Sequence, residues 1–362
     1  MSDAAAPRNA VEAVVHPDPY TYYAGLRERS PLFFDQGLGL WVASTYAVID
    51  EALRHPALHV RPPGEPVPRG LVGTPVGEVF AQLVRMTDGD FHARHKPQVE
   101  RSAHRFSMDD VASAAVQATA QLKDQRDANA LLSAVPVRAI AILLGVPQAS
   151  LDETTRWVGD FVKALGGNPS AQALAAANEA ALALMAQGED AGLGRAAAAN
   201  RIALMQQSLD ATAGLIGNTI SLLREQPELT PAANEPAAWR AFVAEVARWD
   251  APVHNTRRFA AEELMLAGQR IAQGQGVLLV LAGANRDPAL NADPDRFDVA
   301  RSNRRSMTFG AGAHACPGEA IAIEIAAAAL STLSAGDSLQ RVFRRHAGYR
   351  PLPNARVPVF EN

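Results

Sequence analysis

Apolar residues recur at helical spacing over most of the chain. From residue 112 onward this pattern dominates, with clear segments at 136–144, 151–165 and 170–187. The longest helical pattern runs from about 195 to 223 without a proline. Because this length exceeds that of an ordinary globular helix, we expect this helix to thread the centre of the domain.

Strand signals are few and short. The apolar runs at 31–34 and 40–43 flank Asp35-Gln36-Gly37, a combination typical of a strand–turn–strand unit. Two more strand-like pieces lie at 263–266 and 277–280. Short strands of this kind indicate a minor β part beside the helices.

We find no internal repeat and no clean linker. The sequence therefore predicts a single, mainly α domain over residues 1–362 with a small β-rich part. The β-rich N-terminal part is expected at about 1–60, the long central helix at about 195–223, and a cysteine-containing loop at 309–318.

Composition narrows the possible functions. Hydrophobic residues make up 48% of the chain, which is ample for a sizeable core, and the formal charge is only −4. Without a dense Lys/Arg stripe we expect no nucleic-acid partner. The chain has one cysteine, which excludes an intramolecular disulfide and every metal site that needs two thiolates.

The N-terminal residues lack the basic-then-apolar pattern of a signal peptide. No run of about twenty uninterrupted apolar residues occurs in the sequence. We therefore expect a soluble, cytoplasmic protein without a membrane partner.

The segment Phe309 to Gly318 carries the most informative chemistry. Its glycines, among them Gly310, let the backbone take positive φ and approach a flat ligand closely. Cys316 lies at the N-terminus of a predicted helix, where backbone N–H groups and the helix dipole favour a thiolate. The alternative interpretation is that a lone cysteine is merely a small buried hydrophobic residue.

The whole pattern FGxGxHxCxG is present, and it resembles the cysteine-loop signature of the cytochrome P450 family at every fixed position. The resemblance implies a P450 fold and a b-type haem (iron protoporphyrin IX) whose iron takes Cys316 as its axial ligand. It implies that His314 reaches a haem propionate, with Phe309, Gly310 and Gly318 also lining the cofactor. In such a protein the thiolate increases the electron density on the iron, which favours cleavage of the O–O bond.

The resemblance extends in the right order over nearly the whole chain. Residues Glu245 to Arg248 match the family's ExxR helix, in which residues at i and i+3 share one face and can pair. In the family this pair locks an arginine of the following irregular segment, and Arg296 is our candidate. An isolated ExxR sequence is usually a surface ion pair, so its position ahead of the cysteine gives it weight.

Two further segments resemble haem-contacting elements of the family. By its spacing from Pro252, Arg258 is expected to bind a haem propionate. Residues 86–96 resemble the helix written HxxxR, which His92 fits, against the alternative of an ordinary surface histidine. Lys96 stands in the arginine position. Lysine keeps the positive charge but cannot bind a carboxylate through two parallel N–H groups as arginine does.

The oxygen-activating part of the long helix departs from the family pattern AGx[DE]T. Aligned through residues 213–218, Asp210 keeps the acid, whereas Gln207-Ser208 replaces the small pair and Ala211 replaces the threonine. Three explanations compete: a register shift that gives Thr212 this role, a substrate hydroxyl or water that substitutes for it, or a reaction other than ordinary dioxygen-splitting hydroxylation. Asp210 itself is either a proton relay or a solvated helix residue.

The proximal side and the substrate roof also depart from the pattern. The family's Leu-Ala-Arg after the cysteine becomes Ile321-Ala322-Ile323, which removes a charge from the face where an electron donor docks. The region between Gly166 and Arg195 is short, so an abbreviated or mobile lid is expected. The candidate substrate contacts are Val253, His254 and Asn255; the last two side chains could equally bond to backbone.

The resemblance implies a monooxygenase that oxidises a small organic molecule with O2. Two electrons would come from NAD(P)H through ferredoxin reductase and ferredoxin, because no flavin or iron–sulfur domain is evident in the sequence. The alternative enzyme uses peroxide or performs a non-hydroxylating reaction, as the altered 207–211 segment allows. A third hypothesis, from another class, is a non-catalytic haem sensor.

Overall fold

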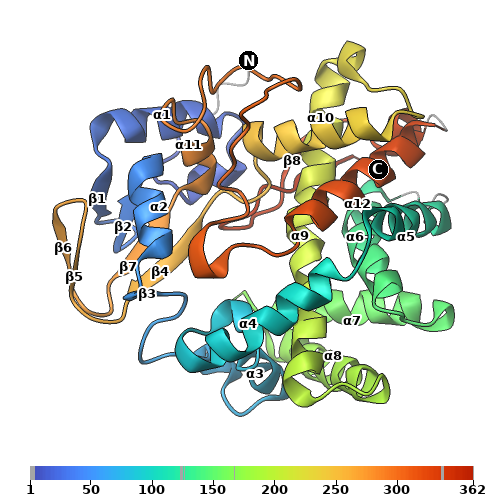
Figure 1. Ribbon diagram of the computed structural model, residues 1–362, viewed down its shortest axis with the longest axis horizontal. Coiled ribbons are helices and arrows are strands. Elements are labelled where there is room, and N and C mark those ends of the chain that lie inside the picture. Colours follow the sequence, from blue (N-terminus) through green and yellow to red (C-terminus); the bar gives the residue numbers. More distant parts are fainter. Residues whose placement is uncertain (1–4, 123–124, 126, 167, 336–337, 362) are drawn as a thin grey trace.

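A computed structural model of the chain describes residues 5–122, 125, 127–166, 168–335 and 338–361. Figure 1 shows a large body of helices beside a smaller part that contains the main sheet. The mainly α fold with a minor β part is therefore confirmed.

The helices occupy most of the chain. The α-helices are α1 (Pro19–Arg29), α2 (Tyr46–Arg54), α3 (Pro75–Phe80), α4 (Gly89–His104), α5 (Met108–Gln121), α6 (Ala128–Leu143), α7 (Leu151–Ala164), α8 (Ala171–Asp190), α9 (Arg195–Glu225), α10 (Pro236–Trp249), α11 (Leu281–Asn285), α12 (Glu319–Ser334) and α13 (Ser338–Val342). The 3-10 helices η3 (Val84–Met86) and η6 (Gly312–His314) adjoin the site described below.

The strands are short. They are β1 (Leu32–Asp35), β2 (Leu40–Ala43), β3 (Leu58–His59), β4 (Thr256–Ala260), β5 (Leu264–Leu266), β6 (Gln269–Ile271), β7 (Gly276–Leu279), β8 (His346–Tyr349) and β9 (Pro358–Phe360).

Helix α9 runs through the middle of the helical body (Figure 1). It has 31 residues, so its length is about 46 Å at the usual rise per residue. From Arg195 onward the sequence contains no proline until Pro227, which begins the next 3-10 turn and cannot continue the helix. Helices α6, α8, α10 and α12 all pack against α9, which explains why its middle is buried on most sides.

The main sheet joins residues from both ends of the chain. Its order is β1-β2-β7-β4-β3, with β2 parallel to β7 and the other pairs antiparallel. The N-terminal hairpin therefore depends on a C-terminal strand, and helices α1 and α2 lie in the N-terminal region that we expected to be β-rich. Strand alternation along β4 exposes Arg257 and buries Arg258.

Helix α8 occupies most of the region between Gly166 and Arg195, in which we expected an abbreviated or mobile lid, and α7 is its neighbour. They pack on each other through apolar residues such as Val158, Phe161 and Ala181. Helix α8 passes into α9 through only the residues 191–194. The two long helices are thus joined by a tight turn.

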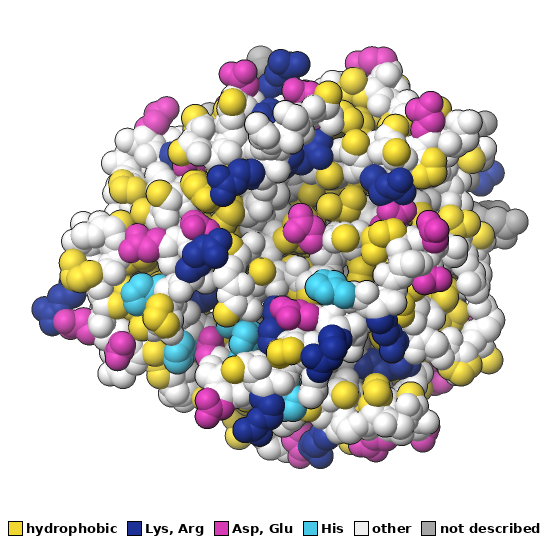
Figure 2. All heavy atoms as spheres, in the orientation of Figure 1, with side chains coloured by type: hydrophobic (Ala, Val, Ile, Leu, Met, Phe, Trp, Pro, Cys, Tyr) yellow, Lys and Arg dark blue, Asp and Glu magenta, His cyan; other side chains and the backbone are white. Residues whose placement is uncertain are grey.

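Helix α12 begins directly after the cysteine segment. Together with η6 it forms the segment Gly312–Ser334, which is long and apolar enough to cross a membrane, although half of it is buried inside the protein. Its apolar side packs against α5, α9 and α10, as expected of a core helix. Figure 2 shows the face on which α4 and α12 lie, where Lys and Arg side chains are interspersed with Asp and Glu.

Substituting Gly214 in α9 tests the packing of the central helix. A Cβ atom at Gly214 would lie 2.6 Å from the carbonyl oxygen of Arg356 and 3.0 Å from Cβ of Pro252. Because backbone must shift to make room, Gly214→Ala should lower the free energy of unfolding by roughly 1–3 kcal/mol. As a control, a Cβ atom at Gly159 in α7 would meet open space. Gly159→Ala should therefore raise the free energy of unfolding by about 1 kcal/mol. Equal effects in urea denaturation would contradict this packing.

Candidate active site

The cysteine segment is a tight loop between the irregular chain after α11 and helix α12. The Cys316 N–H donates to the carbonyl oxygen of Phe309 at 2.9 Å, which closes the loop around η6. Gly310 and Gly312 have φ values of 71° and 68°, the left-handed region that favours glycine. A Cβ at Gly312 would lie 2.6 Å from the carbonyl oxygen of Leu53, so this loop also packs closely on α2.

The thiol of Cys316 lies at the start of α12 and is accessible. Desolvation by neighbouring protein atoms raises the pKa of Cys316, whereas the Gly318 N–H, 3.4 Å from Sγ, and the charges of Lys96 and Arg85 lower it. We expected the helix start to favour the thiolate, but in the protein alone desolvation outweighs it. A bound metal cation deprotonates a coordinating thiol, so a bound iron would favour the thiolate form of Cys316.

Two histidines from distant segments meet beside this loop. The ring of His92 on α4 lies 4.3 Å from the ring of His314 in η6, measured between centroids. His314 Nε2 lies 3.0 Å from Oδ1 of Asp88, and this hydrogen bond helps lower the pKa of Asp88 although burial opposes the shift. The Nε2 atom of His92 is buried and has no hydrogen-bond partner within the described residues. Burial and the neighbouring His314 lower the pKa of His92.

Arg258 on β4 is a second group without a compensating partner. The residue is 5% exposed, and its guanidinium donates only to the carbonyl oxygen of Arg257 and to the Thr256 hydroxyl. It forms no ion pair with any residue in the described ranges, and burial lowers the pKa of Arg258 while the charge of Asp88 raises it. A buried cation without a counter-ion is costly, so an anionic group is expected to complete this site.

These residues fit the haem that the sequence implies. Cys316 offers a single thiolate ligand, and His92 Nε2 and Arg258 are buried groups that form no bond to an acid among the described residues. The positive-φ glycines keep the loop free of side chains where a flat ligand would approach it. Iron would bind Cys316, and the propionates would bind Arg258, His92 and His314.

Lys96 has a different contact from the one we predicted. Its Nζ donates to the carbonyl oxygen of Ala315 at 2.7 Å and lies 3.8 Å from a carboxylate oxygen of Glu100. The lysine therefore ties α4 to the residue before Cys316 and places a positive charge near the sulfur. In this structure it supports the cysteine loop, and its assignment to a propionate stays a prediction.

The altered segment of α9 shows which side chains face open space. Thr212 is 2% exposed, and Ser208 is buried with its hydroxyl on the carbonyl oxygen of Met205. Gln207 and Ala211, one turn apart, are both partly accessible and so share the side of the helix that is not packed. This placement supports the alignment that puts Ala211 at the threonine position and disfavours the register shift to Thr212.

Asp210 is held by a partner that sequence reasoning missed. Its carboxylate accepts from Arg350 at 3.1 Å, and the same guanidinium donates to the hydroxyl of Ser133. Burial raises the pKa of Asp210 and the charge of Arg350 lowers it, with the rise prevailing. Asp210 is thus neither a freely solvated helix residue nor an isolated acid, because it links α9 to the C-terminal segment.

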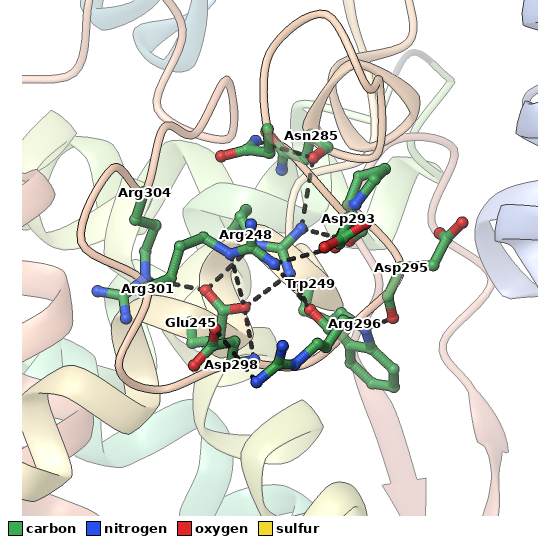
Figure 3. Close-up of polar contacts among 12 residues, drawn as sticks. Glu245, Arg248, Trp249, Asn285, Asp293, Asp295, Arg296, Asp298, Arg301 and Arg304 are labelled. Atoms are coloured by element: carbon green, nitrogen blue, oxygen red, sulfur yellow. Dashed lines mark hydrogen bonds and ion pairs between the residues drawn. The ribbon is translucent and has the colours of Figure 1, made fainter.

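Glu245 and Arg248 form the centre of a buried network shown in Figure 3. Both side chains are 0% exposed and meet at 2.6 and 3.1 Å. Glu245 also accepts from Arg304 at 2.9 Å and from Arg301 at 3.5 Å. Hydrogen bonds from Arg248 and the Asp298 N–H lower the pKa of Glu245 overall, although burial alone would raise it.

Arg296 is not the third member of this network, contrary to our prediction. Its side chain is 70% exposed and lies 3.7 Å from Asp298. Only its carbonyl oxygen points inward, where it accepts from Arg248 at 3.0 Å (Figure 3). Arg304, whose side chain is 20% exposed, takes the position predicted for Arg296.

Two of the three predicted substrate contacts, His254 and Asn255, are also corrected. His254 is fully buried, its Nδ1 lies 2.8 Å from the hydroxyl of Tyr23, and its ring packs against Tyr20. Asn255 donates to the carbonyl oxygen of Pro353 at 2.9 Å, which is the backbone alternative we considered. Val253 packs partly buried in the core beneath the sheet. Tyr20 and Tyr23 of α1 therefore enclose His254, whereas a substrate contact of Val253 stays a prediction.

Three arginines of the site were missed from sequence: Arg85, Arg304 and Arg350. Arg85 in η3 donates to Oε1 of Gln206 at 3.3 Å and contributes a positive charge near Cys316. Nothing in the local sequence distinguishes them from surface arginines, because each partner lies far away along the chain. The cluster Arg301 to Arg305 was the one available signal for Arg304.

Comparisons with known proteins agree with this site. The family model described as Cytochrome P450 matches residues 238–333, which include the Glu245/Arg248 network and the cysteine segment. The chain is 29% identical over 346 residues to 6-deoxyerythronolide B hydroxylase of Saccharopolyspora erythraea, covering 85% of each chain. It is 29% identical over 219 residues to the biotin biosynthesis cytochrome P450 of Bacillus subtilis, covering 54% of this chain and 55% of that protein.

Solved structures share the fold. The structure titled P450BioI in complex with a hexadec-9Z-enoic acid ligated acyl carrier protein has a TM-score of 0.79 at 24% identity, covering 97% of this chain and 100% of that one. Epothilone B-bound cytochrome P450epoK has a TM-score of 0.80 at 23% identity, covering 98% and 96%. These likenesses extend the P450 fold over almost the full length of the chain.

The site fits a haem-thiolate protein through its thiol-bearing loop, its buried Glu/Arg network and its uncompensated donors. The chain belongs to the cytochrome P450 family, as the family model, the relatives and the fold agree. It is an oxidoreductase of the monooxygenase type.

The corrected network gives a direct test of Arg304. Arg304→Ala removes a hydrogen bond from a buried carboxylate and should lower the free energy of unfolding by roughly 1.5–3 kcal/mol. Arg296→Ala removes an exposed side chain and should change it by no more than about 0.5 kcal/mol. Thermal unfolding of the two haem-loaded variants measures this difference. A larger loss from Arg296→Ala would restore the original assignment.

Proposed function

We propose that the protein is a cytoplasmic monooxygenase that inserts oxygen from O2 into a small organic substrate. Two electrons would come from NAD(P)H through ferredoxin reductase and ferredoxin, and the cofactor would be b-type haem. The observation that carries this proposal is the convergence of the Cys316 thiol with the unpaired donors of His92 and Arg258. One anionic, iron-bearing macrocycle satisfies all of these groups.

When bound, the haem would supply an electron-rich, thiolate-ligated iron that activates oxygen. The protein would contribute orientation and protons. Arg258, His92 and His314 would fix the propionates, and Lys96 would hold the carbonyl of Ala315 so that Cys316 keeps its position.

Asp210 is our proposed proton carrier. Burial raises the pKa of Asp210, so it takes up a proton more readily than a surface aspartate does. Its contact with Arg350 fixes the carboxyl at one place on α9. Because Ala211 has no hydroxyl, a water molecule or a substrate hydroxyl would have to carry the proton onward from Asp210.

An electron donor would reach the protein on the face shown in Figure 2. Basic side chains on α4, including Arg94, Lys96 and Arg101, lie on the helix that also carries His92. Positive charge steers an acidic partner, and its effect falls as salt screens it. Ile323 in place of the family's arginine removes one such charge from α12.

The second candidate is a peroxide-using enzyme, which Ala211 favours because no threonine hydroxyl assists O2 cleavage. We first screen small metabolites for a shift in the spin state of the haem-loaded protein, since a clear shift reports a substrate pocket. A complete absence of such shifts would favour the sensor hypothesis instead. A compound that gives the shift then serves as substrate.

Turnover of that substrate decides between the two enzymes. With reductase and ferredoxin we expect product at least roughly tenfold faster than with hydrogen peroxide alone. Asp210→Asn should lower the O2-driven rate by roughly 100-fold, the ordinary range for loss of a proton-transfer group. Asp190→Asn at the end of α8 should leave it unchanged. Product formed only with peroxide, and insensitive to Asp210→Asn, would contradict the monooxygenase proposal.

A further inference from the structure

A groove of about 200 Å³ lies between α4 and the first half of α9. Helix α4 lines it with one face, which includes His95, Val99 and Ser102. Helix α9 lines the other side with residues at helical spacing, among them Arg201 and Leu204. No residue of the cysteine segment lines the groove, so it is separate from the candidate haem site.

The groove contains positive charge without a matching acid. Arg105 and Arg201 both line it, and neither forms an ion pair with a residue in the described part of the chain. The lining residues include no aspartate or glutamate. Burial and the nearby charge of Arg105 lower the pKa of Arg201, as expected for like charges that share a site.

Arg201 is the better-defined of the two cations. It is 7% exposed, and its Nη1 donates to the carbonyl oxygen of Leu144 at 2.7 Å, which fixes the guanidinium. Its Nε is buried and has no partner among the described atoms. An unsatisfied buried donor is unfavourable, and arginine's planar fork is suited to binding a carboxylate. Arg201 therefore places a fixed positive charge, without an acidic partner among the described residues, at the wall of the groove.

The remaining surface of the groove is largely apolar. Val99, Leu144, Leu193 and Leu204 contribute aliphatic side chains, and the small residues Ala196 and Ala197 leave space between the two helices. A fully hydrated inorganic anion would not use this surface. An anion with an apolar body would gain from it through the hydrophobic effect.

We propose that this groove binds a small organic carboxylate. Its carboxylate would meet Arg201 and Arg105, and its aliphatic part would lie along Leu144 and Leu204. Asn200 in the groove accepts from the Val84 N–H at 3.0 Å and donates to the carbonyl oxygen of Gln82 at 2.8 Å. It thereby contacts the segment that leads to Arg85.

Calorimetric titration of the haem-loaded protein tests this site, with butyrate, butyramide and inorganic phosphate as probes. Butyrate should bind at least roughly tenfold more tightly than either control, because only butyrate offers both a charge and an apolar body. Arg201→Gln and Arg105→Gln should each weaken butyrate binding by roughly tenfold or more. Arg101→Gln is the matched control, since it removes an exposed charge from α4 outside the groove.

The haem spectrum separates this groove from the haem cavity. Saturation with butyrate should leave the visible spectrum unchanged. If Arg201→Gln does not fold, as circular dichroism would show, Arg105→Gln decides, because Arg105 is exposed. Unchanged butyrate affinity in the folded arginine variants, equal binding of butyramide or phosphate, or a spectral shift at the haem would each overturn the proposal. None of these results would bear on haem ligation by Cys316.

Discussion

The buried carboxylate of Glu245 is the interaction on which the cysteine loop depends. It receives hydrogen bonds from Arg248 on its own helix and from Arg304 in the irregular segment that leads to the loop. Arg248 in turn binds carbonyl oxygens of Pro294 and Arg296, so one ion pair holds several turns of a segment that has no regular structure. Removing one partner of a buried pair costs about 3–5 kcal/mol, because the other charge remains desolvated. The position of Cys316 is therefore set from outside the loop, by α10.

The two sides of the candidate site differ in how closely they follow the family pattern. The side of Cys316 follows it and is held by many contacts, whereas the facing segment of α9 departs from it. On the side of Cys316, glycine conformations, the Lys96 contact and the His92/His314 pair are all fixed by hydrogen bonds or close packing. On α9, polar Gln207 and the hydroxyl-free Ala211 occupy the part of the helix that faces open space. Ligation and oxygen chemistry are thus supported by different sets of residues.

Local patterns predicted a large part of this structure, and long-range contacts account for the rest. The cysteine loop and α9 were predictable because their signals are contiguous: a fixed motif, and a long helical pattern without proline. The choice of Arg296 over Arg304 was wrong because the segment is irregular, and no periodicity indicates whether a side chain or a carbonyl faces inward. The pairing of Asp210 with Arg350 joins residues 140 positions apart, and burial of His254 requires Tyr23 from α1. Such contacts follow from tertiary packing alone.

Axial ligation by Cys316 is the central claim, and the absorption spectrum of the reduced, carbon monoxide-bound protein tests it most directly. A thiolate trans to carbon monoxide shifts the main absorption band of haem to distinctly longer wavelength than a neutral ligand does. The protein should show this long-wavelength band, and Cys316→Ser should lose it while retaining its far-ultraviolet circular dichroism. A band at the position typical of histidine ligation, or one unchanged in Cys316→Ser, would contradict the account.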